Sequence, residues 1–167
     1  MAITTYTTYA EVRGMLGVSA TDINDTVLAQ SSWSTLLDEA LLDVSSVTSS
    51  LYATIALIAE GSRTATQQRY YNMVRLYASV AVAKELLTSL PMFSTQRLTD
   101  GKAEFDRFAD AYKDVRDSIL GLLPALRTKL VAMVKVLDPA ATTYSPVAAT
   151  FTSNVALGTD PVTTTVV

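Results

Sequence analysis

Four aspartates in the last third of the chain have types and spacing that could support chemistry. They recur every three or four residues and therefore lie along one helix face: Asp106, Asp110, Asp114 and Asp117. Paired carboxylates can act as general acid and base, or can bind a hard cation. Three basic residues are interleaved with them: Arg107, Lys113 and Arg116. A solvated, salt-bridged face accounts for the whole series, and a third interpretation is an acidic wall that lines a channel.

A second acidic patch, Asp38, Glu39 and Asp43, is expected on the polar face of an earlier helix and is also interpreted as solvated. A strip of arginines and tyrosines superficially resembles a nucleic-acid surface. It consists of Arg63, Arg69, Arg75, Tyr70, Tyr71 and Tyr77. Helical placement buries part of these tyrosines, so the arginines are interpreted as surface or interface residues.

The composition of the chain excludes many kinds of enzyme mechanism. The chain has 167 residues with no histidine and no cysteine, which excludes disulfides, thiolate or imidazole ligands and Ser-His or Cys-His catalysis. A net charge of −3 argues against tight binding of a phosphate backbone. With 49% hydrophobic and 17% charged residues, we expect burial against neighbouring molecules as well as within the chain.

Compartment and membrane signals are weak. The first residues lack a basic segment followed by an apolar core, so no signal peptide is expected. The most apolar later stretch, residues 119–137, is interrupted by Arg127, Lys129 and Lys135 and is a poor membrane span.

The apolar spacing predicts an all-α bundle of about four to five helices over residues 1–138. Thr8 and Glu11 form a capping box before a short helix over residues 9–16, which Gly17 ends. Ser19 is expected to cap a second short helix over residues 23–30. A long helix is expected over residues 31–60, and Thr64 with Gln67 caps a further helix that runs to about residue 90.

The last helix should open at residues 99–101 and reach Leu137. Gly121 and Pro124 lie in its middle, and proline removes a helical hydrogen bond at a cost of about 3 kcal/mol. We therefore expect a kink or a break between Gly121 and Pro124. The segment beyond it, residues 125–137, could leave the bundle and pack against another subunit.

Residues 139–167 form an extended arm in which Asp160 is the only charge. Such a segment has too little core of its own to offset its ordering entropy. Two β-branched stretches, residues 147–152 and 162–167, are expected to form strands that add to a partner's sheet. The arm residues predicted to dock are Tyr144, Val147, Phe151, Val155, Leu157, Val162 and Val166.

Three segments together resemble head-tail connector (adaptor) proteins of tailed bacteriophages. They are TYAEVRGMLGV (residues 8–18) with Asp22 and Asp25, YASVAVAKELL (residues 77–87), and LTDGKAEFDRF (residues 98–108). The resemblance covers residues 6–119. It implies a helical bundle assembled as a dodecameric ring beneath the portal, which continues the DNA channel toward the tail. It also implies a C-terminal extension that docks into the portal. The long apolar helix after Gly121 and the uncharged arm depart from the family pattern.

The sequence thus predicts a non-enzymatic structural protein of the virion neck, made in the host cytoplasm and without cofactor, metal or membrane. Its expected partners are the portal protein, a tail or neck protein and copies of itself, while double-stranded DNA passes without specific binding. The alternatives are another phage neck or tail-completion protein and a non-viral helical adaptor. A hydrolase or metal enzyme built on Asp110 and Asp114 is the alternative from another class.

Overall fold

The computed structural model describes residues 3–87 and 102–141, and for residues 102–112 it describes the backbone alone. Within these ranges every regular element is a helix, which confirms the all-α prediction there. The elements are η1 (Ile3–Thr5), α1 (Tyr9–Leu16), α2 (Asp25–Leu28), α3 (Ser31–Leu42), α4 (Thr48–Ala56), η2 (Glu60–Ser62), α5 (Ala65–Leu87) and α7 (Lys102–Leu137). The predicted strands of the arm lie outside the described residues.

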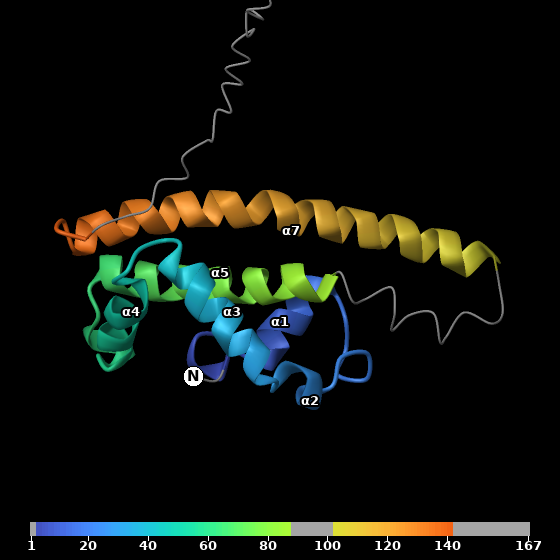
Figure 1. Ribbon diagram of the computed structural model, residues 1–167, viewed down its shortest axis with the longest axis horizontal. Coiled ribbons are helices and arrows are strands. Elements are labelled where there is room, and N and C mark those ends of the chain that lie inside the picture. Colours follow the sequence, from blue (N-terminus) through green and yellow to red (C-terminus); the bar gives the residue numbers. More distant parts are fainter. Residues whose placement is uncertain (1–2, 88–101, 142–167) are drawn as a thin grey trace, which may run out of the picture.

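Helix α5 is the centre of the bundle (Figure 1). It contacts α1, α3 and α4 on one side and α7 on the other. Its consecutive residues from Tyr77 to Ala83 are all buried, as expected for a helix that neighbours surround completely. Small residues make this close packing possible, and those on α5 are Ala78, Ser79, Ala81 and Ala83.

The predicted caps of α1 and α5 are confirmed. The Thr8 hydroxyl accepts from the Glu11 amide at 3.2 Å, and the Glu11 carboxylate accepts from the Thr8 amide at 2.8 Å. Gly17 ends α1 with a φ of 67°, a left-handed conformation that favours glycine. Thr64 and Gln67 form the equivalent reciprocal pair at the start of α5, at 3.2 and 2.9 Å.

The second short helix is shorter than predicted. It spans Asp25–Leu28 and is capped by Asn24, whose side chain accepts from the Val27 amide at 3.0 Å. Ser19 does not cap it, because the Asp22 carboxylate binds the Ser19 amide and hydroxyl at 2.9 and 2.6 Å. These local side-chain bonds fix a separate turn before the helix begins.

The single helix predicted over residues 31–60 is wrong, because α3 ends at Leu42 and α4 begins at Thr48. Partners distant in sequence stabilise the interruption. The Arg127 guanidinium donates to the Asp43 carbonyl at 2.6 Å, and the Tyr70 hydroxyl donates to the Thr48 carbonyl at 2.9 Å. Ser45 and Ser46, which are weak helix formers, give the chain little reason to remain helical there.

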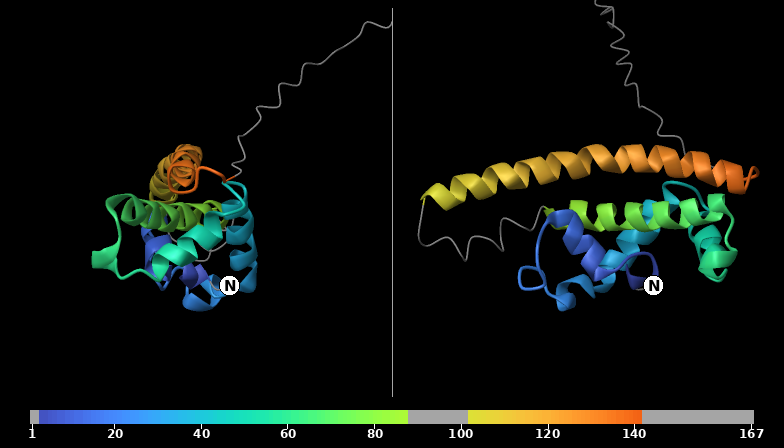
Figure 2. Two further views of the ribbon diagram at one scale, coloured as in Figure 1. Left: turned by 90° about the vertical axis from the view of Figure 1, so that its left-hand side faces the viewer. Right: turned by 180° about the vertical axis from the view of Figure 1, so that it is seen from behind.

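Of the kink or break predicted between Gly121 and Pro124, the break is wrong. Helix α7 continues from Lys102 to Leu137 with Pro124 inside it, and its ribbon bows gently along its length (Figures 1 and 2). Residues 125–137 do not leave the bundle, because Leu126, Leu130 and Val134 are buried in its core. Burying three such side chains contributes about 1.5–3 kcal/mol each, which exceeds the cost of one proline.

Helix α7 is longer than the bundle that it covers. At about 1.5 Å per residue, its 36 residues span about 54 Å, whereas the 23 residues of α5 span about 35 Å. Figures 1 and 2 show the first turns of α7, in yellow, reaching past the end of α5. The core contacts of α7 begin at Val115 and Ile119 in the part whose side chains are described.

Candidate interaction surfaces

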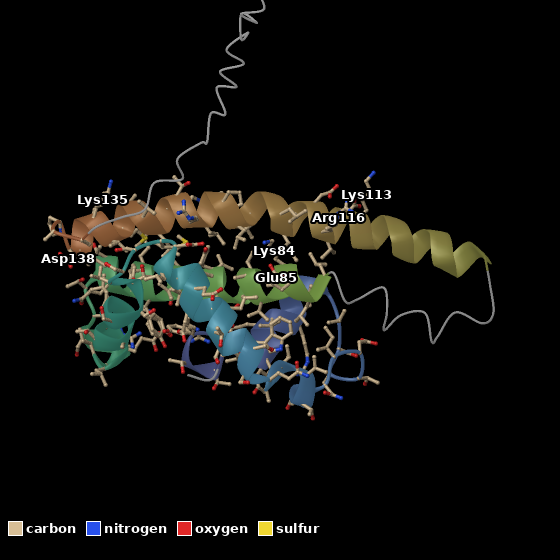
Figure 3. All side chains as sticks on the ribbon, viewed as in Figure 1. Lys84, Glu85, Lys113, Arg116, Lys135 and Asp138 are labelled. Carbon is tan, nitrogen blue, oxygen red and sulfur yellow. The ribbon has the colours of Figure 1, made fainter. Side chains whose placement is uncertain are left out.

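The acidic series occupies the first half of α7. Asp106 and Asp110 lie where the backbone alone is described, whereas Asp114 and Asp117 are both exposed. The Arg116 guanidinium donates to the Asp117 carboxylate at 3.0 and 3.1 Å, and Lys113 points away from α5 (Figure 3). Among the described residues no group of three or more acidic side chains could hold a metal ion. The described part of this face therefore fits the solvated, salt-bridged interpretation.

The second acidic patch lies on the outer face of α3. Leu37 and Leu41 are fully buried, whereas Asp38, Glu39 and Asp43 are exposed, as predicted. Leu42, which is 53% exposed, lies among these carboxylates. The sequence pattern predicts a polar face here and does not predict the protruding leucine.

The strip of arginines and tyrosines is largely internal. Tyr70 and Tyr77 are buried, and the Tyr77 hydroxyl donates to the Ala40 carbonyl at 3.3 Å. Burial raises the pKa of both phenols above their ordinary value of 10.0. Two of the three tyrosines therefore fasten α5 to the α3–α4 region.

The third tyrosine, Tyr71, is half-buried and belongs to a stack of rings. Its ring lies parallel to that of Tyr52 with centroids 4.9 Å apart, and Tyr52 contacts Tyr6 at 5.2 Å. The Arg63 guanidinium lies 4.1 Å from the Tyr71 centroid and also donates to the Ile58 carbonyl at 2.9 Å. These contacts occupy the faces of the Tyr71 ring, which would have to be free for a nucleic-acid base to stack on it.

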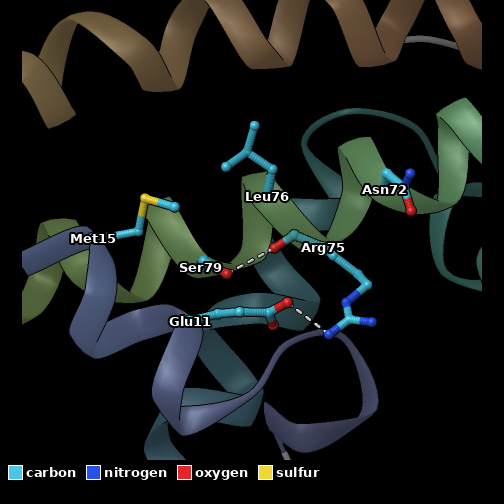
Figure 4. A pocket seen from close by; sticks show the side chains of 6 residues that line it. All are labelled: Glu11, Met15, Asn72, Arg75, Leu76 and Ser79. Carbon is cyan, nitrogen blue, oxygen red and sulfur yellow. Dashed lines mark hydrogen bonds and ion pairs between the residues drawn. The ribbon is translucent and has the colours of Figure 1, made fainter.

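A shallow groove of about 220 Å³ lies between α1 and α5, and Figure 4 shows the side chains that line it. Its walls are Glu11, Met15, Asn72, Arg75, Leu76 and Ser79. Glu11 accepts from the Arg75 guanidinium at 2.7 Å, so the two charges in the groove neutralise each other. The sequence pattern predicts a capping role for Glu11 but not this partner, which is 64 residues away.

Electrostatics around this pair favour both charged forms. Burial alone would raise the pKa of Glu11, but hydrogen bonds from Arg75, Thr8 and Thr7 outweigh it and hold the pKa below 4.5. The same hydrogen bond to Glu11 raises the pKa of Arg75. Ser79 closes the groove floor, where its hydroxyl shares a hydrogen bond of 2.5 Å with Thr7. The Glu11–Arg75 ion pair in the groove thus connects α1 to α5.

The outer face of the C-terminal half of α7 has no covering element among the described residues. Small residues run along its centre: Gly121, Ala125, Thr128 and Ala132. Leu120 is 46% exposed and Val136 is 69% exposed, and Lys135 points away from α5 in Figure 3. This face was not predicted, because the apolar residues of the segment were assigned to a contact with another subunit, whereas the bundle itself buries them.

The predicted docking residues of the arm, from Tyr144 to Val166, lie outside the described residues. No helix in the described ranges combines the length and apolar character that crossing a bilayer would require.

Comparison with known proteins gives no family, because no family model matches the chain and neither a curated protein nor a solved structure is significantly similar to it.

Proposed function

We propose that the protein is a structural component of a phage virion, a head-tail connector that assembles as a ring between the portal and the tail. The observation that carries the proposal is helix α7, which covers the bundle with one face and presents the other face to the outside. That outer face includes Val136, which is 69% exposed. Exposed apolar side chains beside small residues, such as Leu120 and Val136 on this face, support binding to a neighbour when the bundle already has its own core.

Two further observations support this proposal. The helices α1, α5 and α7 occupy the three segments that resemble the connector family. In addition, Asp114 and Asp117 are exposed, as channel-lining residues must be, and Lys113 and Arg116 balance their charge. A face without net charge would let DNA pass without binding it tightly.

The arm is the proposed link to the portal. Residues 142–167 follow Ala141, which packs against the core. Fully extended, 26 residues would span up to about 90 Å, enough to reach across a neighbouring subunit. We propose that its β-branched stretches add strands to the portal.

The test is a truncated chain that ends at Ala141, mixed with the portal protein encoded by the same genome. Helical circular dichroism should remain, because every described helix is retained, while co-sedimentation with portal rings should be lost. Full-length protein in the same experiment is the control. Unchanged binding by the truncated chain would refute the role of the arm, and absence of binding by the full-length chain would refute the connector proposal.

A further inference from the structure

We propose that the outer face of α3 in one copy of this chain docks on the outer face of α7 in the next copy. Only the closure of this contact into a ring rests on the proposed function. The contact itself is argued from charges, exposure and helical spacing in the described residues.

Charge is segregated along the chain. Between Arg13 and Arg63 the sequence has six acidic residues and no basic one: Asp22, Asp25, Asp38, Glu39, Asp43 and Glu60. Between Asp117 and Asp138 it has three basic residues and no acidic one: Arg127, Lys129 and Lys135. The first segment contains α3, and the second forms most of the C-terminal half of α7. One copy therefore presents surfaces of opposite sign, which can steer and orient the approach of a second copy.

The acidic face has a protruding apolar residue at its centre. On α3, Asp38 and Glu39 precede Leu42 by four and three residues, so they flank it on the preceding turn. All three side chains are exposed, and Leu42 is 53% exposed.

The basic face has the complementary arrangement. On α7, Lys129 and Lys135 lie three residues before and after Ala132, so they flank that small residue on opposite sides. Thr128 and Val136 are its neighbours along the helix, four residues away in each direction, and all five residues are exposed. Because Asp38 and Glu39 both precede Leu42, a leucine placed over Ala132 would bring these two carboxylates close to the ammonium group on one side of Ala132.

Among the described residues, Asp38 and Glu39 form no ion pair with Lys129 or Lys135 of the same copy. Within one copy, α3 and α7 meet where the Arg127 guanidinium donates to the Asp43 carbonyl at the end of α3, and the exposed side chains of the two faces point away from the core. Where α3 of one copy meets α7 of the next without the reciprocal contact, the interface is heterologous, and such interfaces close into rings when the rotation between copies permits. The proposed contact is of this head-to-tail kind.

The test uses two full-length double variants with reversed charge. The first is Lys129→Glu with Lys135→Glu, and the second is Asp38→Lys with Glu39→Lys. By sedimentation velocity at about 0.15 M ionic strength, we expect the unmodified chain to associate and each variant alone to associate about tenfold or more weakly. An equimolar mixture of the two variants should recover the association, because every contact in it can again pair opposite charges.

Matched controls change charge elsewhere on the surface. Arg69→Glu on α5 and Glu60→Lys in η2 alter exposed residues that belong to neither α3 nor α7 and should leave association unchanged. Circular dichroism checks that all variants keep their helices. A single-copy state for the unmodified chain, full association of either variant alone, or no recovery in the mixture would overturn the contact.

Portal binding separates this inference from the proposed function. Copies that associate through these faces without binding a portal would uphold the contact and refute the connector proposal. A chain that binds the portal, with either double variant associating normally, would refute the contact and uphold the connector proposal.

Discussion

At the scale of single residues, Glu11 joins three parts of the molecule through one carboxylate. It accepts from the Thr8 amide at 2.8 Å, the Thr7 hydroxyl at 3.0 Å and the Arg75 guanidinium at 2.7 Å. The first bond caps α1, the second holds the segment before it, and the third ties both to α5. The residue therefore stabilises the contact between α1 and α5 more than a surface ion pair would.

Replacing Glu11 with glutamine should lower the free energy of unfolding by about 1 kcal/mol near neutral pH. Because folding lowers the pKa of Glu11 below 4.5, this contribution is complete above pH 4.5 and is lost as the pH falls through the folded-state pKa. Urea unfolding of both proteins at neutral and at acidic pH measures the difference. It should shrink in acid, while the control Glu60→Gln should show little difference at either pH. A difference that grows in acid would contradict the assignment.

Thr48 has a buried hydroxyl for which the described residues offer no hydrogen-bond partner. An unsatisfied buried polar group costs free energy that an apolar group of the same shape does not. Thr48→Val should therefore raise the free energy of unfolding by about 1 kcal/mol.

Thermal unfolding followed by circular dichroism measures this change. The matched control is Thr54→Val, where an exposed hydroxyl donates to the Ser50 carbonyl at 2.9 Å, and no gain is expected. Destabilisation by Thr48→Val would show that the hydroxyl has a partner.

At the scale of elements, the sequence predicted what depends on local chemistry. The caps at Thr8, Gly17 and Thr64 were predictable because their partners lie within four residues. The interruption between α3 and α4 was not, because apolar residues keep their spacing of three and four across it. The groups that stabilise it come from Tyr70 and Arg127, which lie 22 and 84 residues away from their acceptors.

The same distinction applies to α7. Its apolar spacing predicted a long helix correctly. Of the kink or break predicted between Gly121 and Pro124, the break does not occur. Burial of α7 residues against α5 offsets the cost of the proline. A sequence pattern does not show whether such residues are buried by the same copy or by a neighbour. Among the candidate surfaces, the exposure of the acidic patch on α3 was predictable from local sequence. The Glu11–Arg75 pair and the outer face of α7 were not.

Two substitutions by alanine on α7 test which of its faces stabilises the fold. Leu130→Ala should lower the free energy of unfolding by about 2–5 kcal/mol, because Leu130 is fully buried. Val136→Ala, at a position 69% exposed, should change it by less than about 0.5 kcal/mol. Urea unfolding at a concentration where the chain is a single copy measures both, and a small effect at Leu130 would contradict the packing of α7 on α5.

At the scale of the whole molecule, the chain combines a closed core with surfaces left for other molecules. Helix α5 is surrounded by its own bundle, α7 extends beyond it, and charges of opposite sign lie on α3 and on the last part of α7. Such a molecule can associate head to tail without sacrificing any part of its own core. The proposed connector function depends on this property, because a ring must expose one contact surface on each side of every copy.

The most direct test is electron microscopy of the full-length protein bound to the portal encoded by the same genome. The account predicts a closed ring of copies on the portal, with α3 of each copy against α7 of the next and the arm running onto the portal. Single copies, or a protein that does not bind the portal at any concentration, would contradict it.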